Sequence, residues 1–375
     1  MRYVVAGAGL FGCVIAERIA NVLGQPVEVY EKRDHAGGNC HSFTDPESGI
    51  ECHAYGTHIF HTKIPEVWKY INQFTDFNTY RHKVLAHHDG RIYQMPVNLG
   101  TINAVYGASL PPQAAKELIG HEIALDGVAS PRNLEEKAIS LVGRRLYEAF
   151  IKNYTAKQWR RDPAEMPADV ITRLPVRFNY NAEYFDDYWQ GLPLGGYATL
   201  FDRLLENPLV RVHLNQEFRL PDGGLPEDTL LVYTGMPDEL FGYKYGALAW
   251  RSLRFEWQRM QTRDYQGTAV INYTDLQPEF TRIHEFKHLH PERTGPFTCD
   301  TTVICREYPD DYAVGKEAYY PVNDSANNDL YARYEAEAEK IPGLVLGGRL
   351  GSYRYWDMDK AIANALEVFD AKIRR

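Results

Sequence analysis

The N-terminal segment "RYVVAGAGLFGCVIAERIANVLGQPVEVYEKR" contains two apolar runs on either side of a segment with helical periodicity. Residues 3–6 and 27–30 are short and apolar, which predicts two buried strands. Between them, apolar residues recur at helical spacing from Cys13 to Leu23. The pattern therefore predicts a strand–helix–strand unit at the start of the chain.

The spacing of apolar residues changes in two later parts of the chain. Residues from about 100 to 170 read as helical: Asn133 is placed to cap one helix, and Phe150 and Tyr154 are spaced as helical neighbours. From about 210 to 320 the period is that of strands, in "LVRVHL", "TLLVYTG", "TAVINYTD", "FTRIHEF" and "TTVICREY". We expect these segments to form a mixed or antiparallel sheet. Because "LLVYTGMPDEL" also resembles a strand and turn of the first unit, this sheet should interleave with that unit.

The turn after the first strand carries a glycine pattern, Gly7-Ala8-Gly9-Leu10-Phe11-Gly12. In a strand–turn–helix context the first glycine permits the tight turn, the second lets a diphosphate approach, and the third allows close helix–strand packing. The helix N-terminus then offers N–H groups to phosphate. Glu31, at the end of the second strand, is placed to accept the ribose hydroxyls. Together these features predict a dinucleotide site.

The residues after Glu31 favour FAD over NAD. Lys32 and Arg33 follow it, and the doublet Gly37-Gly38 comes shortly afterwards, next to Asn39. NAD enzymes usually continue into another helix here, whereas many flavoproteins make a second glycine turn along the extended FAD.

FAD folds of this kind close with a late strand and helix, and the C-terminal region fits. Residues 344–346 are apolar, a glycine-rich turn follows, and an amphipathic helix is expected from about Asp357. We therefore predict an α/β protein with a discontinuous, Rossmann-like FAD-binding domain, a helical insertion domain and an antiparallel β-sheet domain. The expected segments are 1–80, 191–245 and 319–375 for the FAD-binding parts (191–245 shared with the sheet), 81–98 and 246–318 for the sheet, and 99–190 for the helical domain with a mobile loop at about 160–180.

Net charge and residue composition indicate which classes of binding partner this protein has. A net charge of -9 argues against a general binder of nucleic acid or of anionic membranes. No apolar run reaches the roughly 18 residues of a membrane span, and the N-terminus lacks a signal-peptide layout. Five cysteines without a CxxC pair suit free thiols in a reducing cytoplasm. The 26 tyrosines suit recognition of sugars and nucleobases.

Candidate chemistry centres on arginines in aromatic surroundings: Arg173 and Arg177 in "TRLPVRFNYNAEYF", and Arg282. Arginine forks neutralise diphosphates in bidentate geometry. The histidines of "CHAYGTHIFHT" match no zinc spacing, so we expect no metal, and a Cys–His protease has no organising motif here.

Several longer blocks are more specific: "YGTHIFHT", "YTAKQW", "ITRLPVRFNYNAEYFDDYWQGLPLGGY", "FTRIHEFKH", "YYPVND" and "GGRLGSYRYWDMD". Together they closely resemble the bacterial UDP-galactopyranose mutases, over nearly the whole chain. Phe280, Ser352 and Trp356 depart from the family's usual Tyr, Thr and Leu. The resemblance implies interconversion of UDP-galactopyranose and UDP-galactofuranose through a covalent adduct between the sugar and N5 of reduced FAD. The alternative is a flavin-dependent amine oxidase or desaturase on the same scaffold.

The resemblance also implies residue roles. Arg173 is the arginine of the mobile loop, Arg282 is the fixed arginine, and His58 lies beside the flavin. Arg177 is expected to brace the loop. The substrate wall is expected to comprise Phe150, Tyr154, Thr155, Trp159, Tyr184, Phe185, Asn272, Tyr320 and Tyr355, in addition to the two arginines. The flavin is expected to contact Gly7, Gly9, Leu10, Phe11, Gly12, Glu31, Lys32, Arg33, Gly38, Asn39, His58, Arg349, Tyr355, Asp357 and Met358.

The same resemblance suggests how the protein works in the cell. An external reductant would keep the flavin reduced, and the product would supply a cell-wall polysaccharide or another galactofuranose conjugate. Members of the family are commonly homodimers or larger, so we expect a homo-oligomer.

Overall fold

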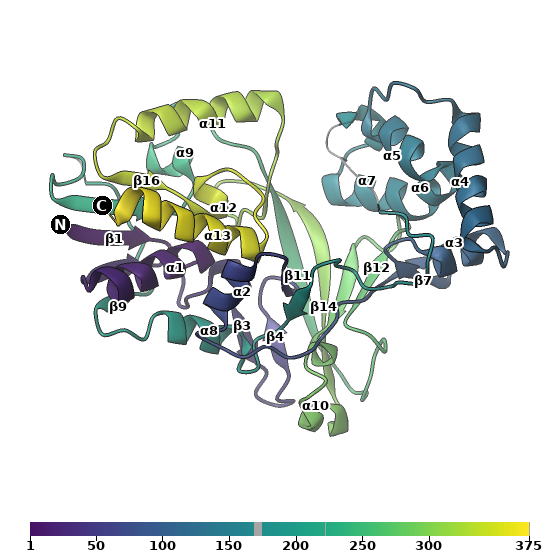
Figure 1. Ribbon diagram of the computed structural model, residues 1–375, viewed down its shortest axis with the longest axis horizontal. Coiled ribbons are helices and arrows are strands. Elements are labelled where there is room, and N and C mark those ends of the chain that lie inside the picture. Colours follow the sequence, from purple (N-terminus) through teal and green to yellow (C-terminus); the bar gives the residue numbers. More distant parts are fainter. Residues whose placement is uncertain (169–174, 222, 375) are drawn as a thin grey trace.

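The computed structural model describes residues 1–168, 175–221 and 223–374. Two large sheets and a group of helices make up the molecule (Figure 1). The parallel sheet, near both chain termini in Figure 1, has the strand order β16-β10-β1-β2-β9. Its strands are β1 (Arg2–Ala6), β2 (Val27–Tyr30), β9 (Val210–His213), β10 (Thr229–Tyr233) and β16 (Leu344–Leu346). The dinucleotide-binding domain is thus assembled from the two ends and the middle of the chain, which confirms the predicted fold class.

The central strand β1 explains why the sheet is parallel and buried. Val4 and Val5 are 3% and 0% exposed, so both faces of the strand are covered, as is typical of α/β sheets. Helix α1 (Leu10–Arg18) and its continuation η1 (Ile19–Leu23) follow β1, and α13 (Met358–Val368) packs against α1. The C-terminal helix therefore lies beside the first helix of the chain.

The second sheet has the order β15-β11-β14-β13-β12-β6-β7. All neighbouring pairs are antiparallel except β12 with β6. Its strands are β6 (Val84–His88), β7 (Arg91–Met95), β11 (Trp250–Met260), β12 (Val270–Tyr273), β13 (Arg282–Glu285), β14 (Thr302–Asp311) and β15 (Tyr320–Pro321). Two of the segments expected in this sheet lie in the parallel sheet: "LVRVHL" forms its edge strand β9, which pairs with β2, and "TLLVYTG" forms β10, which pairs with β1 as its likeness to the first unit suggested. Strand alternation alone does not say which sheet a strand joins.

The helical region stands apart from the parallel sheet, at the upper right of Figure 1. It comprises α3 (Leu99–Tyr106), α4 (Pro112–Asp126), α5 (Leu134–Val142), α6 (Arg144–Tyr147), the π-helix η3 (Glu148–Lys152) and α7 (Asn153–Trp159). Asn133 caps α5, as predicted, because its side chain accepts a hydrogen bond of 2.9 Å from the N–H of Glu136. This region has its own apolar core, to which β6 and β7 contribute Ala86 and Tyr93.

The remaining elements connect these parts. Two short sheets pair β3 (Ser42–Thr44) with β4 (Glu51–His53) and β5 (Phe60–Thr62) with β8 (Trp189–Gly191). The other helices are α2 (Pro65–Ile71), α8 (Gly196–Leu204), α9 (Pro237–Leu240), α10 (Thr294–Thr298), α11 (Ser325–Ala338) and α12 (Gly348–Gly351), with short helical turns at η2 (Gly38–Cys40), η4 (Pro163–Glu165), η6 (Phe286–Leu289) and η7 (Phe369–Ile373). In the described part of the chain no helix is long and apolar enough to cross a bilayer.

Candidate active site

The turn between β1 and α1 opens onto a cleft of about 1290 Å³, counting its open mouth. The first glycine turn, the segment after β2, the segment after β10 and α12 all contribute residues to its lining. Gly7 has φ of +107°, and a methyl group there would lie 2.0 Å from Thr234 Oγ1. A methyl on Gly12 would lie 2.0 Å from the carbonyl oxygen of Gly7. By contrast, nothing lies within 4 Å of the corresponding position on Gly9.

The first turn of α1 is suited to a phosphate. Gly9 is its N-cap, and no side chain caps the helix there. The N–H groups at this end therefore face the cleft that Gly9, Leu10 and Phe11 line. A helix N-terminus with open N–H groups and a small residue beside it binds anions. The start of α1 therefore suits the diphosphate of a dinucleotide cofactor.

Acidic and glycine residues after β2 complete this side of the cleft. The Glu31 carboxylate accepts hydrogen bonds from the N–H groups of Ala8, at 2.8 Å, and Arg33, at 3.0 Å. It is therefore fixed at the strand end while each oxygen keeps a lone pair for a ribose hydroxyl. The second glycine turn packs directly on the first, because the N–H of Gly37 donates to the carbonyl of Ala8 at 2.7 Å.

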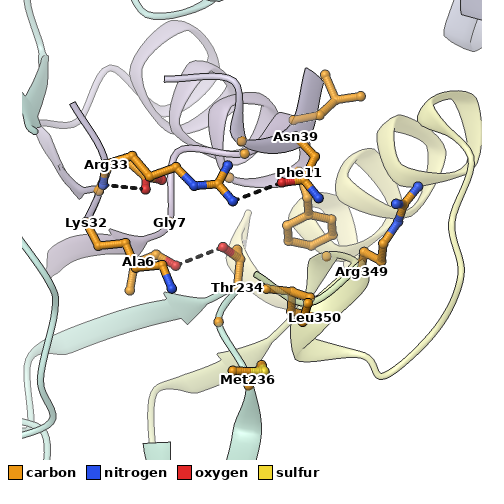
Figure 2. Close-up of a pocket in the computed structure, with 18 of the residues that line it drawn as sticks. Ala6, Gly7, Phe11, Lys32, Arg33, Asn39, Thr234, Met236, Arg349 and Leu350 are labelled. Atoms are coloured by element: carbon orange, nitrogen blue, oxygen red, sulfur yellow. Dashed lines mark hydrogen bonds between the residues drawn. The ribbon is translucent and has the colours of Figure 1, made fainter. Parts of the chain in front are cut away.

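Segments far apart in the sequence close the cleft (Figure 2). Arg33 donates to Asn39 Oδ1 at 2.9 Å and forms an ion pair with Glu317, which comes from the segment before β15. On the opposite side lie Thr234 and Met236 after β10, and Arg349 and Leu350 of α12. Met358 of α13 also lines the cleft, whereas Asp357 and Tyr355 are not among its lining residues.

His58 lines the same cleft and presents a hydrogen-bond acceptor. Its Nδ1 lies 2.8 Å from the carbonyl oxygen of Gly56. A carbonyl can only accept, so Nδ1 carries the proton and Nε2 keeps its lone pair. Burial lowers the pKa of His58 to about 4, so the ring is neutral at pH 7. His58 therefore presents Nε2 as a hydrogen-bond acceptor.

Arg282 of β13 is the central cation on the antiparallel sheet. Its Nη2 donates to the Tyr154 hydroxyl at 2.5 Å, and its Nε lies 3.4 Å from Glu307 Oε1. Burial alone would lower the pKa of Arg282, but Glu307 raises it well above its usual range. In the strand register Arg282 faces Asn272 of β12, whose Oδ1 is buried without a partner in the described structure. Arginine and an unpaired amide oxygen side by side suit a phosphate next to a hydroxyl.

A chain of buried groups connects Arg282 to the loop that carries His58. Glu307 Oε2 lies 3.1 Å from His284 Nε2, and His284 Nδ1 lies 2.7 Å from Thr57 Oγ1. Burial would raise the pKa of Glu307, but Arg282 and then the hydrogen bond with His284 lower it to about 2. The carboxylate is therefore ionised and fixes the guanidinium. Sequence reasoning assigned no role to Glu307 or His284, because the contacts that connect them to Thr57 and to each other join segments distant in the chain.

Aromatic residues from three segments of the chain lie near the pair of Arg282 and Glu307. The ring of Tyr320 is 5.5 Å from that of Tyr355, and the Arg349 guanidinium lies 4.6 Å from the Tyr355 ring. Tyr355 thus connects a residue of the dinucleotide cleft with the sheet that carries Arg282. Phe185 stacks on His61 at 3.7 Å, and its neighbour Tyr184 is 44% exposed.

The other expected site residues take different positions. Phe150 lies in the helical core, where its ring contacts those of Tyr93 and His88. Thr155 is buried and Trp159 is half-buried on α7. Arg177 braces its own segment through Glu183 and Asp186. Arg173 lies outside the described residues.

Two clusters among the described residues have the composition of a metal site, and one of them is fully buried. Glu51, His53 and His290 are buried and place ligand atoms within 4.8 Å of one another. His53 Nδ1, however, accepts a hydrogen bond from the N–H of His58 at 3.0 Å. The neutral ring then carries its proton on Nε2, which leaves no lone pair there for a metal. Arg293 also lies 2.7 Å from Glu51. This cluster is an ion-pair network.

The fold and the cleft define an α/β enzyme of the dinucleotide-binding type, with a second, cation-bearing site on its antiparallel sheet. A family model described as NAD(P)-binding Rossmann-like domain matches residues 5–74. A second, described as UDP-galactopyranose mutase, matches residues 149–355. The chain belongs to the UDP-galactopyranose mutase family, which consists of isomerases and implies a flavin cofactor.

Relatives and solved structures agree with this assignment. The chain is 37% identical to a probable UDP-galactopyranose mutase of Klebsiella pneumoniae, with 98% of this chain and 93% of the relative covered. It is 35% identical to the dTDP-fucopyranose mutase of Escherichia coli, with 100% and 98% covered. A crystal structure of reduced UDP-galactopyranose mutase superimposes with a TM-score of 0.75 at 17% identity, covering 98% of this chain and 94% of that one. That likeness concerns the fold alone.

Proposed function

We propose that this protein interconverts UDP-galactopyranose and UDP-galactofuranose, with reduced FAD in the dinucleotide cleft. The observation that carries the proposal is Arg282, a cation on the antiparallel sheet that Glu307 and Tyr154 fix in place. A departing diphosphate needs such a preorganised charge, because a fixed cation stabilises developing negative charge without reorganisation. An amine oxidase would have no use for it.

The residues that would hold FAD are those of the glycine turns and of α12. The N-terminus of α1 would face the diphosphate, Glu31 the ribose, and Arg349 with Met358 the flavin side of the cleft. When bound in its reduced form, FAD supplies the nucleophilic nitrogen, N5, that the anomeric carbon needs.

The chain's own groups would bind and orient the sugar nucleotide. Arg282 would neutralise the diphosphate, with the hydroxyls of Tyr320 and Tyr355 as further donors. Asn272 Oδ1 is a free acceptor for a sugar or ribose hydroxyl. His58 Nε2 can accept a hydrogen bond from a sugar hydroxyl, because its neutral form predominates at pH 7.

A second substrate is favoured by one observation. The Escherichia coli relative named dTDP-fucopyranose mutase is 35% identical, close to the 37% of the Klebsiella pneumoniae relative. The same cationic site would accept the diphosphate of either nucleotide. Thymidine and uridine sugars therefore both belong in the assay.

The test is chromatographic conversion of UDP-galactofuranose and dTDP-fucopyranose by purified protein, with and without dithionite. We expect conversion of the uridine substrate only with reductant. Faster conversion of the thymidine substrate would shift the assignment to that sugar. Oxidation of amines with release of peroxide, and no mutase activity, would contradict the proposal.

Replacement of the arginines tests the role of the site. Arg282→Ala and Arg173→Ala should each lower turnover by about 100-fold or more while flavin absorbance stays unchanged. Arg254→Ala is the matched control, because Arg254 lies on β11 of the same sheet and is exposed. Near-normal rates in either variant would contradict a role at the diphosphate.

Three further points belong to the proposal. The protein acts in the cytoplasm as a homo-oligomer, and an external reductant supplies electrons only to prime the flavin, because the interconversion has no net redox change. Light scattering of the purified protein measures its oligomeric state directly.

A further inference from the structure

Lys157 is a buried cation that no role above explains. It lies on α7 and is 9% exposed. Its Nζ donates three hydrogen bonds, to the carbonyl oxygens of Tyr273 at 2.7 Å, Pro278 at 3.0 Å and Phe280 at 3.0 Å. All three protons of the ammonium group are therefore used on backbone oxygen. No carboxylate lies within ion-pair distance of this group in the described structure.

The three carbonyls belong to one turn, which connects β12 to β13. Tyr273 is the last residue of β12, and Phe280 lies two residues before Arg282. The same hairpin carries Asn272 and Arg282, which face each other in the register. Lys157 thus holds the end of the hairpin that presents the unpaired amide oxygen and the cation of the site.

The helix that carries Lys157 also contacts Arg282 directly. Tyr154 precedes Lys157 by three residues, so both side chains lie on the same side of α7. The Tyr154 hydroxyl accepts from Arg282 Nη2 at 2.5 Å. The helix therefore contacts the hairpin at two points: Lys157 contacts the turn, and Tyr154 contacts the Arg282 guanidinium. A displacement of α7 from the turn would also move the Tyr154 hydroxyl relative to Arg282.

We propose that Lys157 is a positioning residue: its three carbonyl contacts hold α7 on the β12–β13 turn, and thereby place Tyr154 against Arg282 for the nucleotide diphosphate. This inference rests on the proposed function. Burial lowers the pKa of Lys157 to about 8, which shows that the environment disfavours its charge. A methionine would fill similar space without that cost, so the specific gain from lysine is the three fixed hydrogen bonds.

A second contact of α7 shows why Lys157 matters for the site in particular. Arg160, just after the helix, contacts Asp311 at 2.9 Å and the carbonyl of Pro309 at 3.1 Å. Both partners lie at the end of β14, two and four residues beyond Glu307, which is opposite Arg282 in the strand register. The Arg160 side chain is also 51% exposed, so its ion pair is weak. Arg160 fixes the end of the helix, whereas Lys157 fixes its position over the site.

The experiment compares Lys157→Met with Lys152→Met in full-length protein that retains flavin. Lys152 is exposed in η3, so its variant controls for loss of a lysine in the same segment. UDP binding is measured by titration calorimetry, and kcat and KM by the mutase assay. We expect Lys157→Met to weaken UDP binding and lower kcat by about tenfold or more, because small displacements of binding groups are costly. Lys152→Met should stay within about twofold of the wild type.

A double-mutant cycle separates positioning from simple stabilisation. If Lys157 acts through Tyr154, then Lys157→Met and Tyr154→Phe should be strongly non-additive in UDP affinity. Additive effects would contradict the inference. Lys157→Cys treated with bromoethylamine regains an ammonium at the same reach, and it should recover UDP affinity. Wild-type protein treated in the same way controls for the native cysteines.

The outcomes distinguish this inference from the proposed function. An active wild type with Lys157→Met equal to Lys152→Met in UDP affinity overturns the inference alone, even if Lys157→Met melts at a lower temperature. A wild type that binds UDP but converts neither nucleotide sugar overturns the proposed function, and the affinity cycle still decides on Lys157. A wild type that does not bind UDP overturns both.

Discussion

At the scale of single residues, the glycines of the first turn have different physical roles. A methyl on Gly12 would collide with the Gly7 carbonyl at 2.0 Å, whereas a methyl on Gly9 would meet no protein atom within 4 Å. Gly9 has φ of -72°, which alanine adopts without strain. Gly12 is therefore needed for the fold, and Gly9 for the space in front of α1.

This contrast predicts opposite results for two similar variants. Gly9→Ala should fold with the thermal stability of the cofactor-free wild type but bind flavin more weakly, because the added methyl occupies the cleft. Gly12→Ala should lose about 1–3 kcal/mol of unfolding free energy through overpacking. Circular dichroism of the cofactor-free proteins and visible absorbance after reconstitution measure the two effects. Gly9→Ala with full flavin content would contradict the assignment of the cleft.

At the scale of elements, the π-helix η3 lies where the sequence predicted an ordinary helical pair, Phe150 and Tyr154. Phe150 lies inside η3 and Tyr154 lies in α7, so the wider turn between them changes the faces they occupy. Phe150 joins the helical core, and Tyr154 reaches Arg282. The spacing in the sequence predicted one shared face, whereas Phe150 contributes to the helical core and Tyr154 to the site on the antiparallel sheet.

The C-terminal helix is the element whose removal is most informative. Deletion of residues 348–375 removes α12 and α13 but leaves β16 complete. Because α13 packs against α1 and α12 lines the cleft, the truncated protein should retain no flavin. The control is deletion of Arg374 and Arg375 alone, which should leave the protein yellow. A yellow protein from the longer deletion would contradict a discontinuous cofactor domain.

At the scale of the whole molecule, Glu51 connects the dinucleotide domain to the antiparallel sheet region. Its carboxylate accepts from the N–H of Tyr197 in α8 at 3.2 Å, and Arg293 lies 2.7 Å away, after η6. Burial alone would raise the pKa of Glu51, but contact with His290 and the nearby His53 lower it to about 2. The ionised carboxylate therefore stabilises the native state.

The lowered pKa predicts a pH dependence of stability. The unfolded carboxyl has a pKa near 4.5, so the contribution of Glu51 is present above that value and is lost as pH falls toward about 2. Between pH 6 and pH 3 the loss of this contribution should lower the free energy of unfolding by about 2 kcal/mol. Urea unfolding of Glu51→Gln should show a correspondingly shallower acid dependence than the wild type. Glu47→Gln, an exposed neighbour that pairs with Arg259, should keep the wild-type slope.

Much of the fold could be predicted because its signals are local. The glycine pattern, its flanking strands and Glu31 lie within one short segment, and the C-terminal strand at 344–346 was found at its observed position. Residues of the longer blocks, such as Arg282 and Tyr154, could be assigned to one site because the blocks are peculiar to one family. The role of Arg173 stays a prediction.

The sequence by itself determined the strand–helix–strand unit, the dinucleotide cleft and the family, because short-range patterns of backbone and burial encode them. Only the tertiary structure decided which groups fix the site. Glu307 forms an ion pair with Arg282, and Lys157 donates hydrogen bonds to the carbonyls of the β12–β13 turn. Lys157 and Tyr273 are 116 residues apart, and a backbone carbonyl leaves no trace in residue type. Such contacts arise from the packing of distant segments, which no local pattern records.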